Sequence, residues 1–121
     1  MANPNIVNVT SVLGKLATMD VDSDLTSIIT ADSGEILKIN TLMVANRDSA
    51  DRTGSITAYI NKGTGTDVYI ADQVVVPDAA SLVLISKDNS IYLEETDALQ
   101  LKANTAGFIH AVCSYEIITD T

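Results

Sequence analysis

Short runs of β-branched and other apolar residues recur along this chain, and each run ends at residues such as Gly, Asp, Asn, Ser or Pro. β-Branched side chains suit the pleated, half-buried surface of a sheet. The spacing of the runs therefore predicts strands, and no segment has a helical period long enough to compete. The expected strands cover residues 6–10 (extending to about 18 past a bulge or bend at Gly14), 25–30, 35–46, 55–61, 68–76, 81–85 and 91–93, a run after the acidic turn 94–97, and 108–118.

Alternation within the longest runs predicts which side chains face the interior. In the strand expected over 35–46, one face carries Leu37, Ile39, Thr41, Met43 and Ala45, and its second half is apolar on both faces. In the last strand, one face carries Ile109, Ala111, Cys113, Tyr115 and Ile117. A strand that is apolar on both faces, as 35–46 is in its second half, is expected at the centre of a sheet.

Eight or nine short strands in 121 residues indicate an all-β protein, a single-domain antiparallel β-sandwich. A jelly-roll and an immunoglobulin-like arrangement both fit this pattern. We expect residues 1–121 to form one domain with a short N-terminal arm of about residues 1–5.

The formal net charge is −9, with only seven Lys and Arg residues dispersed along the chain. Binding to nucleic acid phosphates needs clustered cations, so a nucleic acid partner is not expected. No apolar run reaches the length of a membrane span, and the N-terminus lacks the features of a secretory signal. We therefore expect a soluble acidic chain made in a reducing cytosol, and an acidic surface also suits a basic partner.

Few residues here could carry out catalysis. His110 is the one histidine, and its place in a strand favours a packed or surface role over a catalytic one. Cys113 is the one cysteine, and its apolar neighbours indicate a buried inert thiol. No Gly-x-Ser-x-Gly elbow is present, so the chain is not expected to be an enzyme, and an unrecognised hydrolase that uses His110 is the weaker alternative.

Two patterns resemble binding sites for ions. Asp20, Asp22 and Asp24 have the spacing of the first calcium ligands of an EF-hand, but Leu25 and Ala31 stand where that loop needs Gly and Glu. We interpret them as a solvated turn, with a calcium site as the alternative. The stretch 62–66 is Gly-rich with one Lys but lacks the phosphate-loop spacing, so a hairpin loop is expected there. Neither a metal nor another cofactor is predicted.

Four segments resemble small virion proteins of tailed bacteriophages, including those of cyanophages and other marine phages. The similar segments are 1–15, 35–42, 91–99 and 111–116, and together with the pattern between them they span most of the chain. Thr96 stands where such proteins often carry Gly, which leaves the type of the acidic turn open.

This resemblance implies a β-sandwich structural component of a phage virion, made in the cytoplasm of the bacterial host. We expect a capsid decoration or cement protein, a homo-oligomer (a trimer being one such form) that binds the major capsid protein. A neck or tail accessory protein is an alternative position in the particle. A module that binds a surface glycan or receptor is another, although Tyr59, Tyr69, Tyr92 and Tyr115 are scattered along the sequence.

Overall fold

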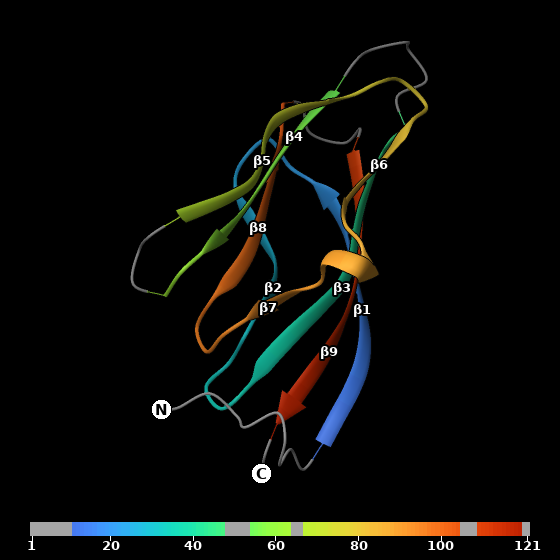
Figure 1. The fold of residues 1–121 in the computed structure, drawn as a ribbon. Helices are drawn as coiled ribbons and strands as arrows, with labels where there is room; N and C mark the ends of the chain where they lie inside the picture. Colours follow the sequence, from blue (N-terminus) through green and yellow to red (C-terminus); the bar gives the residue numbers. More distant parts are fainter. Residues whose placement is uncertain (1–10, 48–53, 64–66, 105–108, 120–121) are drawn as a thin grey trace.

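The computed structural model describes residues 11–47, 54–63, 67–104 and 109–119, and these residues form nine β-strands and one short 3-10 helix (Figure 1). The elements are β1 (Ser11–Val21), β2 (Thr26–Thr30), β3 (Ile36–Asn46), β4 (Gly54–Asn61), β5 (Asp67–Val76), β6 (Ser81–Ile85), η2 (Lys87–Asn89), β7 (Ile91–Leu93), β8 (Ala98–Ala103) and β9 (Ile109–Thr119). The prediction of an all-β chain is confirmed, and most strand boundaries lie within one residue of those expected. None of the described helices is long and apolar enough to span a membrane.

The strands form two antiparallel sheets that pack face to face (Figure 1). Sheet A has the order β1-β9-β3-β6, with β7 also paired to β3, and sheet B has the order β2-β8-β4-β5. The first four strands alternate between the sheets, as in a jelly roll. An immunoglobulin-like sandwich would instead place the first two strands in one sheet. The observed order therefore selects the jelly-roll arrangement of the two that the sequence left open.

The core lies between the sheets and is built from the inward side chains of both. Leu42 and Ile109 come from sheet A, and Ile56, Leu99 and Leu101 come from sheet B, all with no exposed surface. Burying each such side chain contributes about 1.5–3 kcal/mol. Replacing one of them, for example Leu101→Ala, is expected to cost about 2–5 kcal/mol because a cavity remains.

β3 departs from the expected alternation at its centre. Its pairing with β9 shifts register between Ile39 and Thr41, which marks a β-bulge. A bulge adds one residue to one strand and so exchanges the faces of the residues that follow. Leu37 and Ile39 are buried as expected, but beyond the bulge Leu42 and Val44 point into the core. The prediction that Thr41, Met43 and Ala45 share the face of Leu37 is therefore wrong, and Met43 is 42% exposed.

β1 differs from the expected first strand in both position and regularity. Its pairing with β9 runs without a shift from Ser11 opposite Thr119 to Val21 opposite Ile109, so the bulge or bend predicted at Gly14 is wrong. The strand also extends to Val21, and Asp20 therefore lies in β1 and not in the following turn. The expected strand at residues 6–10 and the expected arm at about residues 1–5 lie outside the described residues.

Candidate functional site

The outer face of sheet A carries a row of apolar side chains on β6, β3 and β9, with a further apolar side chain diagonal to it on β1. Met43 on β3 lies opposite Val83 on β6 and opposite Val112 on β9. On β1, Thr18 lies opposite Val112, and Leu16 is two residues away on the same face. We call Leu16, Val112, Met43 and Val83 the apolar band, and their exposed fractions are 65%, 39%, 42% and 54%.

Each strand in the order β1-β9-β3-β6 contributes one member of the apolar band. Val83, Met43 and Val112 are directly opposite one another on neighbouring strands, a spacing of about 5 Å, and Leu16 is diagonal to Val112 at about 7–8 Å. Single exposed apolar residues are common on protein surfaces, whereas continuous patches mark surfaces of interaction. The band is therefore the strongest candidate for an interface on this molecule.

His110 and Asp20 adjoin the apolar band at one end. They lie opposite each other on β9 and β1, with His110 Nε2 3.6 Å from Asp20 Oδ1. A shallow hollow of about 390 Å³ adjoins them, and Thr18 is the one hydroxyl-bearing residue among its described lining residues. A Thr nucleophile normally works with the amino group of a chain terminus. The surroundings of His110 thus favour the expected surface role on a strand over the hydrolase alternative.

The other candidates for chemistry lie apart from one another. Asp22 and Asp24 occupy the turn after β1, where Asp22 Oδ1 accepts a hydrogen bond from the Ser23 N–H at 2.7 Å. Within the described part of the chain, no group of three His, Cys, Asp or Glu residues could hold a metal ion. Cys113 is fully buried between the sheets, and burial raises the pKa of its thiol to about 12. The reactive species is the thiolate, so this environment makes Cys113 inert near neutral pH.

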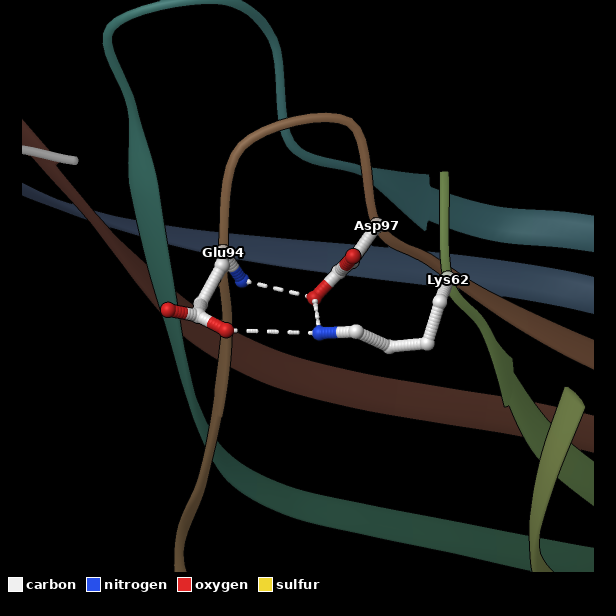
Figure 2. A network of polar contacts seen from close by, with 3 residues as sticks. All are labelled: Lys62, Glu94 and Asp97. Atoms are coloured by element: carbon white, nitrogen blue, oxygen red, sulfur yellow. Dashed lines mark hydrogen bonds and ion pairs between the residues drawn. The ribbon is translucent and has the colours of Figure 1, made fainter. Parts of the chain in front are cut away.

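Lys62, Glu94 and Asp97 form a polar network at one end of the sandwich (Figure 2). Lys62 Nζ donates to Asp97 Oδ2 at 2.6 Å and to Glu94 Oε1 at 3.3 Å, and the Glu94 N–H donates to Asp97 Oδ2 at 3.1 Å. The Asp97 side chain is 4% exposed. The hydrogen bond to Asp97 is the main cause that raises the pKa of Lys62, and the bond to Glu94 adds to it, whereas burial opposes both.

The network fixes the acidic turn between β7 and β8. The Thr96 N–H donates to the Ala31 carbonyl, and the Ala31 N–H donates to the Asp97 carbonyl, both at 2.9 Å. Thr96 itself has a left-handed backbone with φ of 71°. Glycine adopts this conformation without strain, whereas Thr adopts it at an energetic cost. These hydrogen bonds hold the turn against the ends of β2 and β4, so we interpret this region as structural.

Part of the outer face of sheet B is polar and hollowed. A hollow of about 360 Å³ is lined by six polar residues and Ala103. We call it the polar hollow, and its polar residues are Ser23, Ser55, Thr57, Gln73, Lys102 and Asn104. Two of the four tyrosines also meet on sheet B. Tyr59 and Tyr69 lie opposite each other, and their rings stack with centroids 5.2 Å apart.

Sequence reasoning missed both surfaces. The apolar band depends on the β3 bulge, which turns Met43 outward, and no local signal marks that bulge. The polar hollow depends on residues from several elements that only the fold brings together. The four tyrosines are scattered along the sequence, but the register of β4 and β5 places Tyr59 beside Tyr69. The outward position of Val112 follows from alternation alone, because Val112 is next to the inward Cys113 on β9.

Comparison with known proteins shows a shared fold. No protein-family model and no curated protein matches the chain. Among solved structures, a chain from the disulfide-linked pili of Bacillus endospore appendages is similar, with 16% identity, a TM-score of 0.55 and coverage of 92% of this chain and 90% of that one. A chain from the acid-stable capsid of Helicobacter pylori bacteriophage KHP30 is also similar, with 5% identity, a TM-score of 0.54 and coverage of 93% and 91%. At these identities the similarity shows the fold alone, and this fold occurs in chains of a phage capsid and of a pilus.

Proposed function

We propose that this chain is a non-enzymatic structural protein of a phage virion, which decorates or cements the capsid as a homo-oligomer bound to the major capsid protein. The observation that carries the proposal is the apolar band on the outer face of sheet A. The fold shared with a capsid chain supports it, as does the resemblance to small virion proteins. The surroundings of His110 and Cys113 offer little support for an enzyme.

The apolar band supports a protein–protein contact because of its place in the sandwich. The outer faces of a sandwich normally alternate to polar residues, while the inner faces form the core. Here β6, β3 and β9 place apolar side chains on one outer row, and Leu16 on β1 lies diagonal to Val112. Covering this row would remove its apolar surface from water, a favourable transfer term of about 25 cal/mol per Å² of buried area that is partly offset by the costs of association. An exposed apolar patch of this kind suits a second protein surface.

The net charge of the chain predicts different salt dependences for the two proposed contacts, which are self-association and binding to the capsid. Copies of a chain with a net charge of −9 repel one another, and added salt screens that repulsion. Self-association through the apolar band should therefore strengthen as salt rises. Binding of the acidic chain to a basic surface on the capsid should instead weaken with salt. The two dependences have opposite signs and can be measured separately.

The test uses Met43→Lys, which places a charge at the centre of the apolar band. The matched control is Val75→Lys, because Val75 is 59% exposed on β5 of sheet B. Both changes are at exposed positions and should alter the free energy of unfolding by less than about 0.5 kcal/mol. Sedimentation velocity should show oligomers for the wild type and the control, and monomers for Met43→Lys.

Particles of the encoding phage provide the second readout. Wild-type protein should add to purified particles that lack it, Met43→Lys should add at least tenfold less, and labelled protein should lie on the capsid. If the label lies only on the neck or tail, the protein is an accessory protein there and not a capsid decoration protein. A wild-type protein that stays monomeric at all concentrations and adds to no particle would overturn the proposal.

A further inference from the structure

The polar hollow on sheet B originates in an irregularity of β5. Ile56 on β4 lies opposite Val74, whereas Ala58 lies opposite Ala71, so Thr57 faces two residues of β5. This is a β-bulge, and bulges are common next to binding sites, where they redirect a side chain. The bulge places Gln73 at the wall of the hollow.

Gln73 has a left-handed backbone, with φ of 52°. Residues other than glycine adopt this conformation at an energetic cost, and such residues cluster at functional sites. The Gln73 N–H donates to Thr57 Oγ1 at 3.1 Å, which holds the bulge against β4. Gln73 is thus held beside Thr57 at the wall of the polar hollow.

The polar hollow offers many neutral hydrogen-bonding groups that are held in place. The Ser55 N–H donates to Asn104 Oδ1 at 3.0 Å, and the Asn104 N–H donates to the Ser55 carbonyl at 3.2 Å. These bonds orient the Asn104 amide and leave its NH2 donors unused by them. Lys102, opposite Thr57 on β8, adds an ammonium donor. None of the described lining residues is a carboxylate.

An aromatic surface lies one step along the sheet from the polar hollow. Thr57 and Tyr59 are two residues apart on the same face of β4, a separation of about 7 Å. Tyr59 is 4% exposed beneath Tyr69, while Tyr69 is 57% exposed. Opposite Tyr59 on β8 lies Gln100, whose Nε2 donates to Ser27 Oγ at 3.0 Å. The face therefore presents an exposed ring beside amides and hydroxyls.

We propose that the polar hollow and the Tyr69 ring together bind a neutral oligosaccharide. The C–H face of a sugar ring packs on an aromatic ring, and its hydroxyls pair with amide, hydroxyl and ammonium groups such as those of Gln73, Thr57 and Lys102. Jelly rolls serve as lectin domains as well as capsid proteins. An acidic sugar is disfavoured because Asp22 and Asp72 adjoin lining residues in the chain and the net charge is −9. The proposal is independent of the apolar band, which lies on the other sheet.

The test is a titration of the full chain, followed by NMR, with cellohexaose, maltohexaose, mannohexaose and chitohexaose, and with a galacturonate hexamer as the acidic probe. We expect saturable binding of at least one neutral hexamer, and binding of the acidic one at least tenfold weaker. The absence of saturable binding with all four neutral hexamers at millimolar concentration would overturn the proposal. Binding confined to the galacturonate hexamer would also overturn it.

Two variants and one control locate the site. Tyr69→Ala should weaken binding at least tenfold, whereas Tyr92→Ala, which removes a 43% exposed tyrosine from sheet A, should not. Gln73→Gly should weaken binding severalfold while keeping or raising the melting temperature, because glycine relieves the left-handed backbone. Equal losses for Tyr69→Ala and Tyr92→Ala, or full binding by Gln73→Gly, would place the sugar elsewhere and contradict the proposal.

Discussion

Lys62 Nζ lies 2.6 Å from Asp97 Oδ2, and this ion pair joins the end of β4 to the turn between β7 and β8. The Asp97 side chain is nearly fully buried, whereas the Lys62 side chain is 36% exposed. A buried carboxylate depends on its partners, because water cannot replace them. The contact therefore couples two loops that are more than thirty residues apart in the sequence.

Replacing Asp97 should test this coupling. Asp97→Ala removes the acceptor of two hydrogen bonds, and we expect a loss of about 1–3 kcal/mol in the free energy of unfolding. Glu94→Gln is the control, because Glu94 is 58% exposed and an exposed ion pair contributes about 0–1 kcal/mol. Urea unfolding monitored by circular dichroism gives both values. Equal effects of the two changes would show that burial of Asp97 does not matter.

Gly63 and Thr96 make a second contact between the same loops. A methyl group added at Gly63 would overlap Thr96 Oγ1 and lie 2.8 Å from Thr96 Cβ. Gly63→Ala should therefore destabilise the protein by about 1–3 kcal/mol. Thr96→Gly removes the obstacle and relieves the left-handed backbone at this position, and should be neutral or stabilising by up to about 1 kcal/mol.

The double variant Gly63→Ala/Thr96→Gly should recover most of the loss caused by Gly63→Ala. Thermal unfolding of the four proteins gives the coupling energy between the two sites. Simple addition of the two single effects would mean that the overlap is relieved in another way.

The free energy of unfolding should decrease as the pH rises into the alkaline range. Burial raises the pKa of Cys113 to about 12 from 9.0, and it is the main cause of the raised pKa of Tyr59 and Tyr115, while hydrogen bonding to Asp97 raises that of Lys62. In each case the folded state holds its proton more tightly than the unfolded state. The stability contributed is thus present below the unfolded pKa and is lost as pH rises toward the folded one.

The thiol titrates first, so its effect can be isolated. Between about pH 9 and pH 10 Cys113 should lower the free energy of unfolding by up to about 1.4 kcal/mol per pH unit. In Cys113→Ala this decline should begin about one pH unit later, when the tyrosines and Lys62 start to titrate. Calorimetry from pH 8 to pH 11 provides the comparison, and identical pH profiles would contradict the assigned cause.

Burial of the Cys113 thiol also predicts that alkylating reagents modify it slowly in the folded protein. Iodoacetamide should leave Cys113 of the folded protein unmodified at pH 8 for hours, and should modify it within minutes in concentrated urea. Mass spectrometry counts the modified chains. Rapid alkylation without denaturant would show that the thiol is accessible.

Strand positions could be predicted from the sequence because alternation and turn residues are local signals. In β4 the inward Ile56, Ala58 and Ile60 and the flanking Gly54 mark the strand directly. In β9 the same reasoning gave the inward Ile109, Ala111 and Cys113. The choice between the two sandwich types was not local, because it depends on which strands pair.

The bulges limited what could be predicted of the surfaces. One extra residue in β3 turns Met43 outward, and another in β5 places Gln73 in the polar hollow. Their sequences carry no glycine at those points, so neither bulge is visible before the strands are paired. The burial of Asp97 was also hidden, because an acid in a turn is normally solvated and its partner Lys62 is distant in the chain.

The most direct test of the structural role is oxidative footprinting of Met43 in free protein, diluted until it is monomeric, and in purified phage particles. Met43 lies at the centre of the apolar band, and Tyr69 on sheet B serves as the internal reference. We expect Met43 to be oxidised at least tenfold more slowly in the particle, while the rate at Tyr69 changes less than twofold. Equal rates at Met43 in the free and particle-bound protein, or absence of the chain from the particles, would contradict it.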